Sequence, residues 1–169
     1  MSAMCAVEDG DLELALQHMM HAENLVGRTA EVVCRYAICW SYFDMSKFHT
    51  LVREALELNA KHPRTNYILG IEAVSGNQFE KAIGFYQTAL ENYPKGDRFH
   101  LNETYNNLGR VYFGLGNYAE AKNVWEKGLV LLPTDQMTKR NLSEFIYNNP
   151  SVPKALREIS PFIEKFLAR

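Results

Sequence analysis

Apolar residues recur along this chain at three- and four-residue intervals, which is the period of an amphipathic helix. The clearest example is the face formed by Phe79, Ala82, Ile83, Tyr86 and Leu90. Proline follows this run at Pro94, and a second run ends in the same way at Pro133, because proline cannot sit in a helix interior. We therefore predict an all-α chain of short helices.

Small and large residues repeat at identical distances in two segments. A leucine–glycine pair is followed by alanine after twelve residues, an aromatic after four, a small residue after three and proline after five. The members are Gly70, Ala82, Tyr86, Ala89 and Pro94, then Gly109, Ala121, Trp125, Gly128 and Pro133. Such self-similarity predicts a helix-turn-helix unit that is stacked several times.

Glycine–asparagine pairs stand between the two halves of these units, at residues 76–77 and 116–117. We expect each pair to end the first helix in a left-handed residue and to place its asparagine as the cap of the second helix. Residues 10–11, a glycine and an aspartate, repeat this chemistry near the start of the chain.

Small residues are expected where two helices of one unit cross. Ala37, Gly70 and Gly109 would face Ala82- and Ala121-type positions, so that the backbones approach closely. The space toward the next unit would be filled by the aromatics Trp40, Tyr86, Tyr112 and Trp125. A large side chain at Gly70 or Ala121 would then overpack the crossing, at a cost of about 1–3 kcal/mol.

These features resemble the tetratricopeptide repeat, a 34-residue helix-turn-helix unit. The resemblance covers nearly the whole chain and is strongest in residues 63–96 and 102–135. It implies an all-α, right-handed superhelical solenoid of antiparallel helix pairs, with a C-terminal capping helix, in one domain over residues 1–169. The expected parts are a partial repeat at 1–29, repeats at 30–62, 63–101 and 102–135, and a partial repeat with a cap at 136–169.

Residues 30–62 depart from the repeat pattern. Phe48 stands where the other copies have Ala82 and Ala121, and Val52 stands where they have an aromatic residue. We interpret this as an exchange of volume across one helix crossing.

The two ends need separate interpretations. Residues 150–169 are expected to cap the last apolar face, with Ser160 as the N-cap of a final helix at 161–168. If Ala15 keeps the register, Ala3 is the crossing position of a first helix that lacks its first turns. Our hypothesis is an excised segment of a longer protein. The alternatives are a naturally short first helix or one that pairs with another subunit.

The resemblance also implies that ligands bind the concave face lined by the first helix of each repeat. The expected peptide-binding residues are Arg35, Ile38, Tyr42, Arg64, Tyr67, Ile71, Asn106, Asn107, Arg110, Phe113 and Arg140. This mixture suits an apolar peptide that carries some acidic residues. The alternative is that capping helices or packing between repeats occupies much of the surface, since Tyr and Ile at helical spacing are most often core.

No catalytic residues, cofactor or metal site are predicted. The carboxylate clamp of chaperone-binding relatives is disfavoured, because Asn107 alone fits it. His18 and His21, with Cys5 nearby, have a spacing that can bind zinc, but a solvated helix face is the simpler interpretation. Cys34 and Cys39 are interpreted as small core residues rather than a redox pair.

Bulk properties narrow the function further. The net charge of −2 disfavours nucleic-acid binding, and no apolar run is long enough to span a membrane. Three cysteines among apolar residues favour a cytoplasmic protein. The prediction is a non-catalytic protein–protein interaction scaffold that binds a peptide or partner helix. The alternatives are a regulatory or targeting segment of a larger multidomain enzyme and a self-association module, such as a homodimer.

Overall fold

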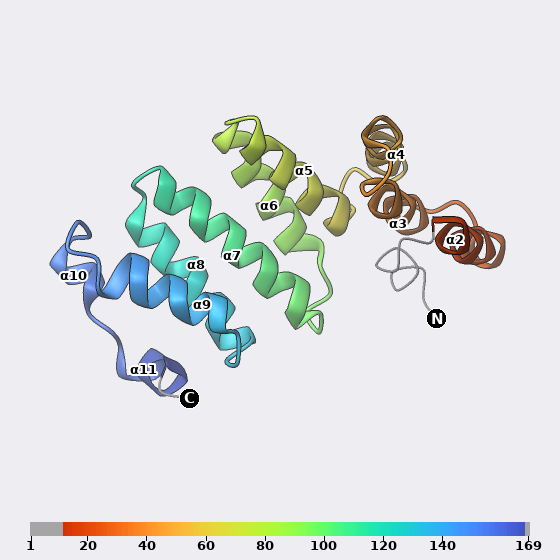
Figure 1. Cartoon of the computed structure of the whole chain (residues 1–169). Coiled ribbons are helices and arrows are strands. Elements are labelled where there is room, and N and C mark those ends of the chain that lie inside the picture. The colour runs from red at the N-terminus through yellow and green to blue at the C-terminus, as the bar shows by residue number, and fades with distance from the viewer. Residues whose placement is uncertain (1–11, 168–169) are drawn as a thin grey trace. The chain divides into compact units, whose positions relative to one another are not determined.

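The computed structural model describes residues 12–167, and it contains helices and no strands over that range (Figure 1). The first helices are α2 (Leu12–Val26), α3 (Ala30–Trp40), α4 (Met45–Leu58), α5 (Pro63–Ser75) and α6 (Phe79–Asn92). They are followed by α7 (Arg98–Gly114), α8 (Tyr118–Leu131), α9 (Gln136–Asn141), the π-helix η1 (Leu142–Tyr147), α10 (Lys154–Arg157) and α11 (Pro161–Leu167). The predicted all-α class is confirmed. The predictions for Ala3, Cys5 and residues 10–11 lie outside the described residues.

The chain forms two compact units, residues 1–69 and 70–169, and the division falls inside α5. In the first unit α3 packs against α4 and α2. In the second, α7 packs against α8 and α6. Each unit is thus built from neighbouring helices that are joined by short turns, as expected for stacked helix pairs.

The crossings of the second unit differ from the prediction. A Cβ atom placed on Gly70 would lie 2.6 Å from Cδ1 of Tyr86, and one on Gly109 would lie 2.5 Å from Cε2 of Trp125. The aromatic rings therefore lie directly over the glycines of their own helix pair, instead of only filling the space toward the next one. Glycine is required here because no other residue leaves room for the ring.

The turn after α7 has the predicted register, whereas the turn after α5 is shifted by one residue. The left-handed residue after α5 is Asn77 (φ 55°), and the one after α7 is Gly116 (φ 79°). The N-caps of α6 and α8 are consequently Gln78 and Asn117, and neither side chain makes a capping hydrogen bond. Both turns instead satisfy the helix end through the backbone, because the N–H of the following residue bonds to a carbonyl five residues earlier.

The α3/α4 crossing agrees with the predicted exchange of volume. Phe48, Val52 and Ala55 of α4 are all buried, and Ala37 of α3 is fully buried. Val52 is smaller than the aromatic residue that stands at the matching position of the other pairs, which is consistent with an alanine, rather than a glycine, at position 37.

The last apolar face of the second unit is covered by the C-terminal segment. Val152 and Ile163 join the core cluster of Trp125, Leu129 and Ile146. The expected final helix is present as α11, and Ser160 Oγ accepts a hydrogen bond from Ile163 N at 3.4 Å. Residues 150–167 therefore cap this unit.

Candidate functional site

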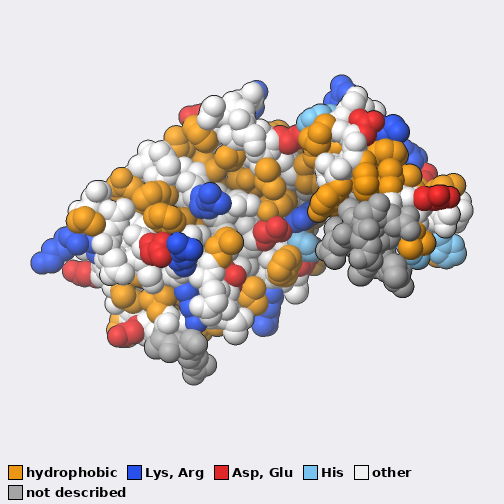
Figure 2. Space-filling model, in the orientation of Figure 1, with side chains coloured by type: hydrophobic (Ala, Val, Ile, Leu, Met, Phe, Trp, Pro, Cys, Tyr) orange, Lys and Arg blue, Asp and Glu red, His pale blue; other side chains and the backbone are white. Residues whose placement is uncertain are grey.

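A cleft of about 390 Å³ opens between the first helices of two successive pairs, α5 and α7. It is entirely within the second unit. Its lining comprises Ile71, Val74, Ser75, Phe79, Tyr86, Asn107, Arg110, Val111, Gly114 and Leu115. Figure 2 shows hydrophobic side chains gathered between α5 and α7, with a basic side chain beside them. Of the predicted binding residues, the cleft brings together Ile71, Asn107 and Arg110.

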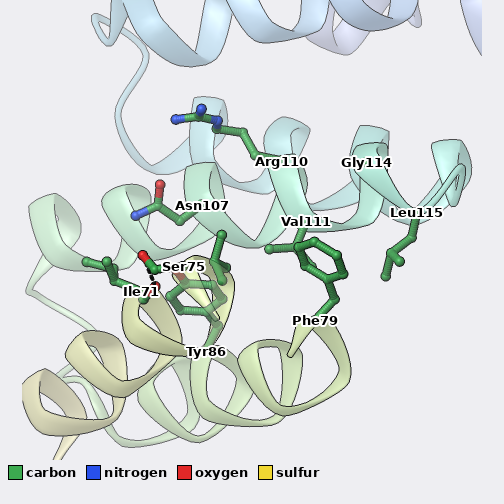
Figure 3. Close-up of a pocket in the computed structure, with 10 residues that line it drawn as sticks. Ile71, Ser75, Phe79, Tyr86, Asn107, Arg110, Val111, Gly114 and Leu115 are labelled. Carbon is green, nitrogen blue, oxygen red and sulfur yellow. Dashed lines mark hydrogen bonds between the residues drawn. The ribbon is translucent and has the colours of Figure 1, made fainter. Parts of the chain in front are cut away.

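The apolar floor of the cleft follows from the crossing geometry. Because Gly70 has no side chain, the ring of Tyr86 lies against α5 and reaches the cleft from α6. Phe79, the first residue of α6, lies beside Val111 of α7 (Figure 3). Burial raises the pKa of Tyr86 to about 12, with smaller opposing effects of nearby charges, so its hydroxyl is neutral at physiological pH.

The polar groups of the cleft lie at its edge. Ser75 Oγ donates a hydrogen bond to the carbonyl of Ile71 at 3.2 Å, so its hydroxyl is already engaged with α5. The side chain of Arg110 is exposed and extends outward from α7 (Figure 3). The cleft therefore combines an apolar interior with a cationic rim.

Phe113 lies on α7 beyond this cleft. Its ring centroid is 5.1 Å from Phe145 of η1, 5.4 Å from Tyr118 and 6.2 Å from Trp125. Phe145 is 37% exposed and was not among the predicted residues. It stands in a π-helix, and the residue pattern of this segment carries no signal for that change of helical geometry.

Asn106 has a structural role. Its side chain is 5% exposed and donates to Asp135 Oδ2 at 3.2 Å, and its Oδ1 accepts from Asn141 Nδ2 at 3.2 Å. The Thr138 hydroxyl is 3.0 Å from the same Oδ1. This network joins α7 to α9, so a ligand on the surface would not reach the Asn106 side chain. Its place in the predicted set is corrected accordingly.

The remaining predicted residues have varied surroundings. Arg140 of α9 pairs with Glu144 at 3.0 Å. In the first unit, Arg35 pairs with Glu31, Ile38 is half-buried and Tyr42 is 62% exposed. Arg64 lies 4.6 Å over the ring of Tyr67, which is only 4% exposed. Tyr67 is therefore buried, as the alternative interpretation expects.

Other candidate chemistry is limited within residues 12–167. No cluster of three or more His, Cys, Asp or Glu residues there could hold a metal ion. Burial raises the pKa of Cys34 to about 11, so this thiol is unreactive, and Cys39 is likewise buried and free. No helix in this range is long and apolar enough to cross a membrane.

Comparison with known proteins identifies the repeat. The tetratricopeptide repeat family model matches residues 102–135, a segment that contains most of α7 and all of α8. A search of curated protein sequences gave no match.

Solved structures share the fold over most of the chain. One is Pseudomonas aeruginosa PilF, with 18% identity and a TM-score of 0.68 over 85% of this chain and 64% of that one. A second belongs to the Cut9–Hcn1 hetero-tetramer of the APC/C, with 18% identity and a TM-score of 0.71 over 99% of this chain and 34% of that one. MamA is a third, with 16% identity and a TM-score of 0.59 over 98% of this chain and 90% of that one.

The first two of these structures are longer proteins, and this chain spans 64% and 34% of their lengths. At these identities the likeness concerns the fold. Together, the repeated crossings of glycine under an aromatic ring, the family match and the shared fold show that residues 102–135 match the tetratricopeptide repeat and that the chain has a tetratricopeptide-like helical-repeat fold.

Proposed function

We propose that this chain is a non-catalytic protein–protein interaction module that binds a peptide segment or partner helix on the face of its first helices. The observation that carries the proposal is the apolar cleft between α5 and α7. Ile71 remains 42% exposed at its edge, where an inserted apolar side chain would remove it from water. Such a module would act in the cytoplasm.

The surroundings of the cleft extend this surface along α7. Phe113 and the exposed Phe145 form an aromatic patch next to the Arg140–Glu144 ion pair. Large aromatic side chains with a polar rim are typical of the energetically important centres of protein interfaces. The Cut9–Hcn1 structure, whose fold this chain shares, is itself an assembly of two kinds of polypeptide.

Site-specific photocrosslinking tests the proposal. A benzophenone amino acid is placed at Ile71, and the matched control carries it at Lys81, an exposed residue of α6 outside the cleft. We expect discrete crosslinked polypeptides from the Ile71 variant only. Equal crosslinking from both positions, or crosslinking at Lys81 alone, would contradict a binding face on the first helices.

A second candidate function is self-association, which is favoured by one feature of the first unit. A cleft on α2 is lined by Leu12, Leu16 and Met20, and Met20 is 58% exposed. Sedimentation equilibrium over a concentration series tests this alternative. A Met20→Lys variant should remain monomeric if a dimer forms there, whereas an unchanged dimer constant would exclude this face.

A further inference from the structure

The arginines on the first helices differ in how their charge is neutralised. Arg35 pairs with Glu31 on α3, and Arg140 pairs with Glu144, each across a spacing of four residues. The residues four positions before and after Arg110 are Asn106 and Gly114, so the α7 sequence supplies no such acid. Among the described residues, Arg110 has no salt-bridge partner, although it lies at the edge of the apolar cleft.

The environment of Arg110 strengthens any interaction with an anion. Arg110 shares the lining of the cleft with the apolar residues Val111 and Phe79, and it is close enough to Tyr86 for its charge to lower the pKa of that hydroxyl. An ion pair at the edge of an apolar surface is less screened than one in bulk water. Because Arg110 forms no ion pair with an acidic residue in the described part of its own chain, it need not break one before it binds a carboxylate of a partner.

We propose that the guanidinium of Arg110 binds a side-chain carboxylate of the bound polypeptide, a proposal that rests on the proposed function above. The partner inserts an apolar side chain between Ile71 and Val111, and an adjacent Asp or Glu side chain meets the Arg110 guanidinium. The cleft volume of about 390 Å³ is near the lower end for ligand pockets, so it accommodates one or two side chains rather than a whole helix face. The recognition element is therefore short.

An acidic side chain is a better occupant than the carboxylate of a chain terminus. A terminus captured by a protein is typically held by several converging donors, as in a backbone nest. Here the cleft lining is mainly apolar, and Arg110 is its one charged residue. Comparing free-acid and amidated peptides separates the two sources, because amidation removes only the terminal charge.

The test begins with a random ten-residue peptide display library, selected on the full chain. Enriched peptides are synthesised with fluorescent labels, each with a free and with an amidated C-terminus, and their affinities are measured by anisotropy. We expect enrichment of an acidic residue next to a large apolar one. Replacing that acid by its amide should weaken binding about tenfold, and Arg110→Gln should do the same, because a charge-assisted hydrogen bond is lost in both cases.

A double-mutant cycle assigns the contact to this pair. Once Arg110→Gln is present, the amide peptide should bind no more weakly than the acidic one, and Arg110→Glu should select peptides with a basic residue instead. The matched control is Lys81→Gln, which removes an exposed positive charge of α6 outside the cleft. We expect that control to change the affinity less than twofold. Thermal melts verify that each variant is folded.

Different outcomes overturn different claims. If Ile71→Asp abolishes binding while Arg110→Gln leaves the acid preference intact, the cleft binds the peptide and the role of Arg110 is refuted. The same conclusion follows if amidation, rather than loss of the acidic side chain, weakens binding. If Ile71→Asp leaves every selected peptide bound, the peptides bind elsewhere, and the proposed function itself is refuted.

Discussion

The helix pairs α3/α4 and α7/α8 reach the same close crossing with different residues. In α7/α8, Gly109 lies under the fully buried indole of Trp125, whose Nε1 donates to the carbonyl of Asn106 at 3.1 Å. In α3/α4, Ala37 is also fully buried, but the second helix carries Val52 at the matching position. The comparison shows that the repeat constrains the combined volume of the two facing residues rather than the glycine itself.

The largest expected effect comes from adding a Cβ under the indole. In Gly109→Ala, the new methyl group would lie 2.5 Å from Cε2 of a ring that is hydrogen-bonded and fully buried, so the helices must separate. We expect a loss of about 3 kcal/mol in the free energy of unfolding, measured by urea denaturation. The control is Gly84→Ala in α6, where a Cβ meets nothing within 4 Å, and the variant should be up to about 1 kcal/mol more stable. Equal effects at both positions would contradict the crossing geometry.

A second variant copies the α3/α4 solution into α7/α8. Gly109→Ala combined with Trp125→Val introduces the residue types that α3 and α4 carry at the matching positions, Ala37 and Val52. We expect the double variant to be more stable than the sum of the single changes predicts, by about 1–2 kcal/mol, because the steric conflict disappears. Urea denaturation of the four proteins in this cycle measures the coupling. Strict additivity would show that the two residues do not share the crossing volume.

A smaller effect concerns the polar contact that joins α7 to α9. Burial alone would raise the pKa of the Asp135 carboxyl, but hydrogen bonds from Thr138, Asn102 and Asn106 outweigh it and hold the pKa below its usual value. A lowered folded-state pKa contributes stability that is present above about pH 4, the unfolded value, and is lost as pH falls through the folded value. Asp135→Asn should cost about 1–2 kcal/mol at pH 7, and the difference should shrink below pH 4. Urea denaturation across pH 2.5–7 would reveal a constant difference if the carboxylate has no such role.

The smallest effect is expected at a surface ion pair of the first unit. Arg28 follows α2 and bonds to Glu54 of α4, with its side chain 45% exposed. Because water and salt screen such pairs, Arg28→Ala should lower the free energy of unfolding by about 0.5 kcal/mol. This difference should be smaller in about 0.5 M salt. A loss above about 2 kcal/mol in thermal or urea denaturation would mean that this contact organises the unit.

Much of the fold could be predicted from residue spacing. The pairs Gly70/Tyr86 and Gly109/Trp125 share one spacing, and the prolines mark the ends of α6 and α8, because helix formation and its interruption are local. The turn register could not be settled so easily. Asn77 and Gly116 both tolerate a positive φ, and the choice between neighbouring residues depends on where the preceding helix stops.

The candidate site was predictable only in part. Ile71, Asn107 and Arg110 do meet at one cleft, but Asn106 is buried and Phe145 was missed. Adjacent positions such as Asn106 and Asn107 point in directions that differ by about 100° on a helix. Which of the two is covered depends on where the next helix packs, and that helix is specified by residues far along the chain.

The amino-acid sequence by itself determined the helical class and the repeat, because both depend on residue type and local spacing. Tertiary structure alone decided that the ring of Tyr86 lies over Gly70, where it forms part of the cleft lining, and that Phe145 stands beside Phe113. The physical reason is that exposure and cavity shape depend on the packing of several helices at once, and a local pattern specifies only the face that each helix presents.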